Sequence, residues 1–213
     1  MTIKKYHQSH LVITNDSGKK LIIDPGYFTF DPSSGFKVEE FQGADVYLIT
    51  HQHADHLDPN TIKEVVGQAP VFGNFDVVSK LSEVGVAGRE IKNREKFSAA
   101  GFEIEAVDLP HFKIPGKEIP PNTGFIINGI FFHAGDGFYL EGVNVKNAAL
   151  PLGHPALSTV GVLEFARALG AKLVIPIHID AYPRDPNELK KIAEPFGIDV
   201  RPLSNGEELD IKS

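Results

Sequence analysis

Cysteine and tryptophan are both absent from this chain of 213 residues, and methionine occurs only once. The absence of thiols excludes disulfide bonds, a thiolate zinc site, a CxxC redox pair and a cysteine nucleophile. Any transition metal that the protein binds must therefore be held by histidine and carboxylate side chains.

Long apolar runs are also absent. The apolar stretches at 46–49 (VYLI) and 173–177 (LVIPI) are far too short to cross a bilayer. The N-terminal sequence MTIKKYHQSH contains two lysines but no apolar stretch of signal-peptide length behind them. These features predict a cytoplasmic protein that does not associate with a membrane.

An excess of positive charge is lacking as well. Lysine and arginine together number 21 against 28 acidic residues, which gives a net charge of −7 with histidine neutral. The paired lysines at 4–5, 19–20 and 190–191 are scattered, so no basic stripe is available to neutralise the phosphates of a nucleic acid. We expect a small-molecule substrate and no nucleic-acid partner, and the sequence leaves the oligomeric state open.

The pattern of apolar and turn residues predicts a single domain of the α/β (α+β) class over residues 1–213. The composition, 42% hydrophobic and 23% charged, is that of a globular protein. Strands are predicted at 10–14, 20–24, 45–50, 102–109, 123–127, 130–133 and 173–178, and helices at 59–66, 76–84, 159–169 and 186–196. Two sheets packed face to face with helices outside would satisfy this order, because each sheet can bury one face against its partner and the other under helices.

The sharpest local feature is the sequence HQHADH at 51–56, which lies directly after a predicted strand and before a predicted helix. Three imidazoles and a carboxylate so close together would need many buried hydrogen-bond partners if they served only the core. A loop at the end of a strand can turn His51 and His53 toward one point while Asp55 and His56 face another. The alternative interpretation is a polar surface loop that is rich in histidine.

Three further residues with metal-binding side chains follow predicted strands elsewhere in the chain. His111 ends the segment EIEAVDLP, Asp136 follows a hairpin strand in FFHAGDG, and His178 closes the apolar run LVIPI. Because loops at strand ends gather at one rim of a sheet, we expect these residues to lie near the histidine motif.

This ordered set of residues resembles the metallo-β-lactamase-fold superfamily of metal-dependent hydrolases, and the resemblance extends from about residue 23 almost to the C-terminus. It implies a four-layer αββα sandwich. Within the superfamily, the stretches NTGFIINGIFFHAGD, PLGHP and IPIHIDAYPRDPNELKKIA are most similar to a small bacterial branch of ascorbate-6-phosphate lactonase-like proteins. The chain departs from the family pattern at Gln52, Gly137 and 153–158.

The resemblance implies a centre with two divalent metal ions, for which zinc is the expected metal and manganese or iron the alternatives. By position, the first ion is assigned to His51, His53 and His111, the second to Asp55, His56 and His178, and the bridge to Asp136. The implied activity is hydrolysis of an ester-like bond, in a lactone or phosphate ester of a small polar metabolite, by a metal-bridging hydroxide. Asp55 would also take part in catalysis by orienting the nucleophile or passing a proton to the leaving group.

Other residues are expected around this centre. Asp24 in LIIDPG is predicted to accept a hydrogen bond from a ligand histidine or to fix the histidine loop, although Asp-Pro-Gly also makes an ordinary turn. His133 is either a residue that orients the Asp136 loop or a structural histidine. His154 is expected to contact the substrate, and Tyr182 and the aromatic group at 27–30, which begins with Tyr27, are expected to form walls of the cleft.

Two other functions are compatible with the same ligand residues. One is iron-dependent redox chemistry on the same fold, and the other is a metal-binding protein without catalytic turnover. A fold carries many reactions, so the sequence does not choose the substrate.

Overall fold

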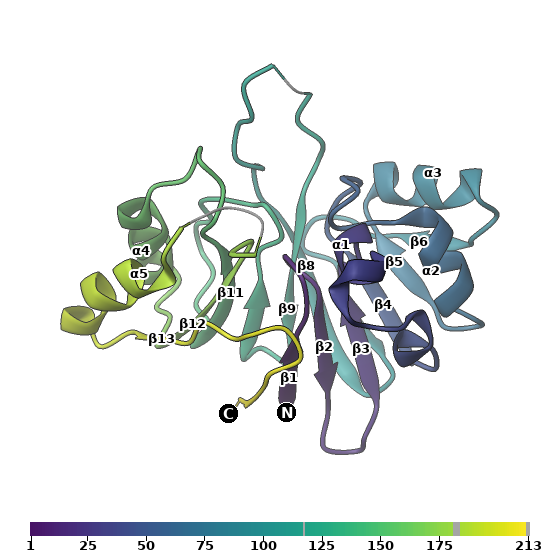
Figure 1. Cartoon of the computed structure of the whole chain (residues 1–213), viewed down its shortest axis with the longest axis horizontal. Coiled ribbons are helices and arrows are strands. Elements are labelled where there is room, and N and C mark those ends of the chain that lie inside the picture. The colour runs from purple at the N-terminus through teal and green to yellow at the C-terminus, as the bar shows by residue number, and fades with distance from the viewer. Residues whose placement is uncertain (117, 181–183, 212–213) are drawn as a thin grey trace.

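Two mixed β-sheets face each other in the centre of the molecule, and helices cover both outer faces (Figure 1). The computed structural model describes residues 1–116, 118–180 and 184–211. Both chain ends lie on the same side of the molecule, opposite the extended loop between β8 and β9 (Figure 1).

The first sheet has seven strands in the order β14-β1-β2-β3-β4-β5-β6. It combines an antiparallel half from β14 to β3 with a parallel half from β3 to β6. The strands are β1 (Thr2–Lys5), β2 (Leu11–Thr14), β3 (Lys20–Ile23), β4 (Val46–Ile49), β5 (Val71–Gly73), β6 (Gly88–Glu90) and β14 (Glu208–Asp210).

The second sheet also has seven strands, in the order β13-β12-β11-β10-β9-β8-β7. Strands β10 to β13 are parallel and strands β7 to β10 antiparallel. The strands are β7 (Lys96–Ala99), β8 (Phe102–Asp108), β9 (Thr123–Ile127), β10 (Phe131–His133), β11 (Asn147–Pro151), β12 (Leu173–Ile177) and β13 (Asp199–Val200).

The helices divide between the two outer faces. In Figure 1, α2 and α3 lie outside the first sheet and α4 and α5 outside the second. The α-helices are α1 (Tyr27–Phe30), α2 (Pro59–Val65), α3 (Phe75–Glu83), α4 (Thr159–Ala168) and α5 (Pro186–Ala193), and short 3-10 turns occupy Pro32–Ser34, Val38–Phe41 and Glu194–Phe196. None of the helices in the described ranges is long and apolar enough to cross a membrane.

The side chains of the central strands alternate between the two faces of each sheet, and together they form three apolar layers. In β4, Leu48 points into the layer between the two sheets, whereas Tyr47 belongs to the layer beneath α2 and α3. In β9, Phe125 enters the central layer and Ile126 the layer beneath α4 and α5. Because side chains alternate between the faces of a strand, each sheet is buried on both sides, and the predicted four-layer αββα sandwich is confirmed.

The sequence-based expectation omits seven strands of the described residues, namely β1, β5, β6, β7, β11, β13 and β14. In β11 (Asn147–Pro151), Asn, Ala and Pro are poor strand formers, and only its complete burial between β10 and β12 makes it a strand. The helix expected over 186–196 is α-helical only to Ala193, since Pro195 has no N–H to continue the ladder and the chain tightens into a 3-10 turn.

A buried histidine makes the stability of this fold sensitive to acid. His10 is completely buried, its Nδ1 lies 3.0 Å from Thr29 Oγ1, and its ring packs on Phe41. Burial lowers its pKa from 6.5 to about 3. The unfolded chain therefore takes up a proton at this residue before the folded chain does.

We expect the free energy of unfolding to fall as the pH decreases from 6.5 toward 3, with a contribution from His10 of up to about 1.4 kcal/mol per pH unit. Urea unfolding of the metal-free protein and of His10→Gln across this pH range measures the contribution as the difference between their slopes. Parallel slopes for the two proteins would show that His10 is not the responsible group.

Candidate metal centre

Seven side chains with metal-binding atoms meet at one rim of the two sheets, just beyond the strand ends. They form two groups, and within each group the ligand atoms all lie within 4.8 Å of one another. The first group consists of His51, His53, His111 and Asp136, and the second of Asp55, His56 and His178. The structure thus brings all seven sequence-predicted ligand residues together, with Asp136, the predicted bridge, grouped with His51, His53 and His111.

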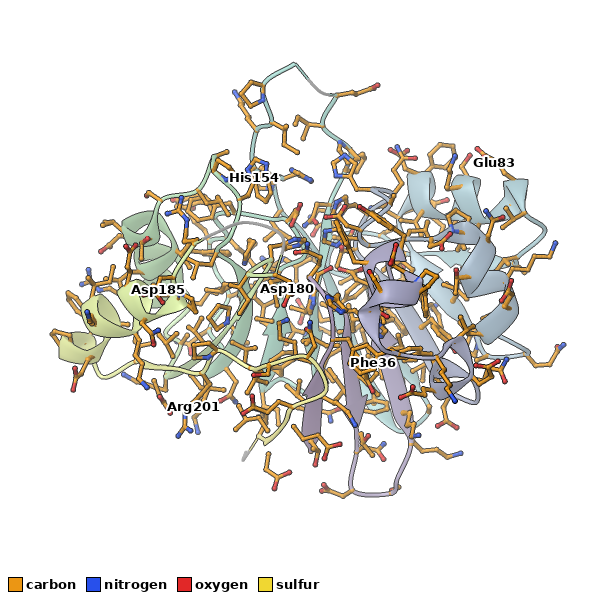
Figure 2. All side chains as sticks on the ribbon, viewed as in Figure 1. Phe36, Glu83, His154, Asp180, Asp185 and Arg201 are labelled. Atoms are coloured by element: carbon orange, nitrogen blue, oxygen red, sulfur yellow. The ribbon has the colours of Figure 1, made fainter. Side chains whose placement is uncertain are left out.

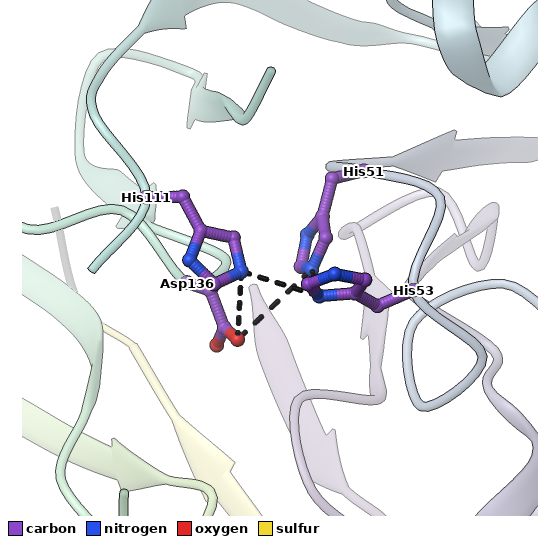
Figure 3. Close-up of side chains that lie close together, drawn as sticks. All are labelled: His51, His53, His111 and Asp136. Carbon is purple, nitrogen blue, oxygen red and sulfur yellow. Dashed lines mark hydrogen bonds and ion pairs between the residues drawn. The ribbon is translucent and has the colours of Figure 1, made fainter. Parts of the chain in front are cut away.

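The first group is compact, as Figure 3 shows. His53 Nδ1 lies 3.1 Å from His51 Nε2 and 3.3 Å from His111 Nε2. The Oδ2 atom of Asp136 lies 3.4 Å from His111 Nε2 and 4.0 Å from His51 Nε2. Three imidazole nitrogens and one carboxylate oxygen therefore surround a single point.

The second group lies on the other side of the same aspartate. Asp55 Oδ2 is 3.8 Å from both His56 Nε2 and His178 Nδ1. The Oδ1 atom of Asp136 is 2.8 Å from His178 Nε2 and 3.5 Å from His56 Nε2. One oxygen of Asp136 thus faces each group, which is the arrangement that a bridging carboxylate requires.

The chemistry of the donor atoms fits divalent metal ions. Among the described residues, His56 Nε2, His178 Nε2 and Asp136 Oδ1 are buried, and the close approach of Asp136 Oδ1 to the two nitrogens does not form a hydrogen bond. Leaving such atoms unpaired in a protein interior costs roughly 1–3 kcal/mol each. A cation coordinated by all three would remove that cost, and nitrogen and oxygen donors of this kind suit zinc, manganese or iron.

Hydrogen bonds behind the rings fix which nitrogen of two histidines points inward. His111 Nδ1 lies 2.6 Å from the carbonyl oxygen of Phe112, to which it donates, so Nε2 carries the lone pair. His56 Nδ1 lies 2.7 Å from Asp24 Oδ2. An oriented ring with a basic inward nitrogen is a better ligand than a freely rotating one.

Asp24 is itself held in a strained backbone position. Its φ angle is 52°, and its carboxylate accepts hydrogen bonds from the backbone N–H and the hydroxyl of Thr50, both at 2.8 Å. The carboxylate therefore links the end of β3 to the residue that precedes the histidine motif, and it contacts a ring of the second group. The sequence predicted that Asp24 would contact a ligand histidine or fix the histidine loop, and the structure places its carboxylate against both His56 and Thr50.

The pKa shifts of the histidines in the centre favour the binding of a cation. Burial lowers the pKa of His51 far below its ordinary value and also lowers the pKa values of His53 and His111, so these rings stay neutral and able to coordinate. At His56, burial opposes protonation but the carboxylates of Asp136 and Asp24 outweigh it and raise the pKa well above 6.5. The second group therefore attracts positive charge.

His133 lies behind the Asp136 loop and outside both ligand groups. Its Nδ1 accepts a hydrogen bond from the N–H of Gly135 at 3.1 Å, and its Nε2 lies 2.9 Å from the carbonyl oxygen of Ser9. Gly135 has a φ angle of 58°, and a Cβ there would lie 2.5 Å from Asn122 Oδ1. The ring thus holds the backbone immediately before Asp136.

A cavity of about 300 Å³ opens directly above the centre. Residues of both metal groups form its floor, and apolar or aromatic side chains form the walls: Tyr27, Phe28, Phe112, Ile114 and His154. Tyr27 stacks on Phe28 with ring centroids 4.1 Å apart, and His154 packs on Phe112 at 4.4 Å. His154 and Tyr27 are therefore placed where a substrate would contact them.

The aromatic group at 27–30 divides between the cavity and the core. Core packing was the alternative for its phenylalanines, and the ring of Phe30 packs on Phe41 with centroids 5.4 Å apart and does not line the cavity. Tyr182 lies outside the described residues.

Sequence reasoning missed three polar residues that support the centre. Ser9 Oγ lies 3.0 Å from His56 Nδ1, and Thr50 Oγ1 lies 3.1 Å from His51 Nδ1. Asn122 Oδ1 accepts a hydrogen bond from the N–H of Asp136 at 3.0 Å. Thr50 is signalled by its place between a strand and the histidine motif, whereas nothing local marks Ser9 or Asn122, since only the fold brings them to the site.

Two facing mixed sheets with histidines and aspartates at their strand ends define a metallo-β-lactamase-type protein. The chain belongs to the family described as the beta-lactamase superfamily domain, which matches residues 2–178. The predicted superfamily is therefore confirmed.

Similar proteins agree with this assignment. The chain is 30% identical over 211 residues to the UPF0173 metal-dependent hydrolase of Pyrococcus furiosus, with 89% of this chain and 92% of that protein covered. It is 29% identical over 229 residues to the protein of the same name from Pyrococcus abyssi, with 98% and 100% covered. Igni18, a metallo hydrolase from Ignicoccus hospitalis, superimposes with a TM-score of 0.80 over 99% of both chains at 24% identity, and this likeness shows the fold alone.

The bridging position of Asp136 generates a test. Asp136→Asn keeps the shape of the side chain but removes its charge, so metal affinity should fall by more than about a hundredfold and bound metal should be lost from both groups. His133→Gln keeps a donor for the Ser9 carbonyl and should retain metal content near that of the wild type. Elemental analysis after dialysis measures both, and equal losses in the two variants would contradict the distinction between ligand and supporting residue.

Proposed function

We propose that this protein is a dinuclear metal-dependent hydrolase that cleaves an ester-like bond, in a lactone or phosphate ester, of a small polar metabolite. The observation that carries the proposal is the placement of Asp136, whose two oxygens face separate groups of imidazole ligands at the floor of a cavity. Zinc is the proposed metal, with manganese or iron as alternatives, because the donors are imidazole nitrogens and carboxylate oxygens.

When bound, a pair of divalent ions supplies a water of lowered pKa as nucleophile and polarises the oxygen of the scissile bond. The residues of the chain prepare the site for that reaction. His51, His53 and His111 stay neutral because they are buried, which keeps their nitrogens available as ligands. Asp136 compensates the positive charge that gathers at the centre.

Asp55 is the proposed proton carrier. Its side chain is 30% exposed, whereas the side chain of Asp136 is 5% exposed, so Asp55 is the more accessible of the two carboxylates that line the cavity. From there it can hold a proton and release it to a leaving group that occupies the cavity.

The cavity walls offer a way to hold the rest of the substrate. Tyr27 and Phe28 form one aromatic surface, and Phe112 packed against His154 forms another. His154 Nδ1 accepts a hydrogen bond from the N–H of Ala156 at 3.1 Å, which places its proton on Nε2 as a donor. The similarity to ascorbate-6-phosphate lactonase-like sequences in the segment 122–136 supports a lactone as one candidate substrate.

A substrate panel tests the proposal. Metal-free protein should show no turnover, and protein loaded with zinc, manganese or iron should hydrolyse at least one member of a panel of lactones, phosphodiesters, phosphomonoesters and amides. Addition of a chelator should lower the rate by more than about a hundredfold, because none of the described residues that line the cavity is a serine, threonine, cysteine or lysine.

Oxygen uptake measured in the same samples separates the alternatives. Consumption of oxygen by the iron-loaded protein without hydrolysis would favour redox chemistry. Metal binding without turnover on either assay would favour a binding protein. Undiminished hydrolysis by the metal-free protein would contradict the proposed mechanism.

A further inference from the structure

A buried lysine lies beneath the second ligand group. Lys5, the last residue of β1, is completely buried. Its ammonium donates to the carbonyl oxygen of Tyr6 at 2.8 Å, to Asp180 Oδ2 at 2.9 Å and to Asn205 Oδ1 at 3.1 Å. Burial of an ammonium group is costly unless every donor is paired, and here the three donors have three acceptors.

The main anionic partner of Lys5 is close in sequence to a metal ligand. Asp180 follows His178 by two residues, and it lies near the middle of the molecule (Figure 2). The same Oδ2 atom accepts a hydrogen bond from the N–H of Gln8 at 2.7 Å, while the N–H of His178 donates to the carbonyl oxygen of Gln8 at 3.3 Å. The segment 178–180 is thus fastened to the N-terminal turn at both ends.

The N-terminal turn, residues 6–10, also contacts His56, another member of the second group. Ser9 Oγ lies 3.0 Å from His56 Nδ1, and the carbonyl oxygen of Ser9 lies 2.9 Å from His133 Nε2. His133 in turn holds the backbone before Asp136. Within the described part of the chain, none of the hydrogen bonds of Lys5, Gln8, Ser9 or Asp180 reaches His51, His53 or His111.

The backbone of His178 and of Gln8 adopts a strained conformation, which the hydrogen bonds between the two segments help to hold. His178 and Gln8 have φ angles of 59° and 58°, in the left-handed region that residues with a side chain rarely adopt because the Cβ crowds the backbone. The backbone of Gly153 also packs closely against His178, since a Cβ on Gly153 would lie 1.5 Å from the carbonyl oxygen of His178. His178 therefore contacts both the backbone of Gly153 and the N-terminal turn.

We infer that the Lys5–Asp180 ion pair is a positioning device for the second ligand group. It locks the N-terminal turn against the loop of His178, so that His56 and His178 are held ready for the second metal ion. Lys5 is a positioning residue and touches neither ion nor substrate. This inference rests on the proposed dinuclear function.

The variant Lys5→Met tests it, because methionine keeps most of the side-chain length and removes the charge. The matched control is Lys19→Met, since Lys19 also pairs with an aspartate, Asp45, at 2.9 Å but is 53% exposed and far from the centre in the sheet. Titration of metal-free protein with Co²⁺, followed by calorimetry and by visible absorption, resolves the two binding events. We expect Lys5→Met to weaken one event by about tenfold or more and to spare the other, as loss of a supporting residue does, and Lys19→Met to change neither.

A second readout does not depend on metal. In the metal-free protein, hydrogen exchange at the His178 amide should accelerate by about tenfold or more in Lys5→Met, because the hydrogen bond to Gln8 opens more often. The Leu48 amide in the buried strand β4 should be unaffected. If Lys5→Met does not fold, Asp180→Asn removes the same ion pair at a residue whose side chain is 21% exposed.

The outcomes distinguish the inference from the function on which it rests. If a folded variant binds both ions with wild-type affinity and its His178 amide exchanges at the wild-type rate, the inference is overturned. It is also overturned if both binding events weaken equally and amide exchange accelerates throughout the two sheets. A wild-type protein that binds one ion only would contradict the dinuclear proposal, and the His178 exchange rate would then still decide whether the ion pair positions this loop.

Discussion

The carboxylate of Asp136, buried between two sets of imidazole rings, is the interaction on which the rest of the site depends. Burial alone would raise its pKa, yet electrostatic interaction with the rings of His178 and His56 holds that pKa well below the ordinary value. A buried anion of this kind needs positive charge on both sides. The hydrogen bonds of Asn122 and His133 around its loop serve to keep it between the two groups.

The three apolar layers explain how such a polar centre is tolerated. Strands β4, β10 and β12 are buried on both faces, so the sheets are rigid platforms whose ends deliver polar side chains to one rim. The buried polar atoms at this rim face one another, the supporting residues or the metal site that the donor set fits. The strained backbone at Asp24 and His178 is located at this rim, where the surrounding structure compensates its cost.

Much of this arrangement could be predicted from the sequence. The motif at 51–56 and the strand-end positions of His111, Asp136 and His178 are local patterns that indicate a metal site, and the resemblance to the metallo-β-lactamase-fold superfamily implies the division of the ligands between two ions. Strand β11 could not be predicted because its residues form a strand only under burial. Lys5 and Ser9 could not be predicted because their roles arise from contacts with Asp180 and His56, which are 175 and 47 residues away in the chain.

In the proposed dinuclear centre, two metal ions lie on opposite sides of the Asp136 carboxylate. Anomalous diffraction from crystals grown with zinc, recorded on both sides of the zinc absorption edge, locates the ions. We expect two peaks, one among His51, His53 and His111 and one beside His56 and His178, with one oxygen of Asp136 directed at each. A single peak, or two peaks on the same side of Asp136, would contradict this arrangement.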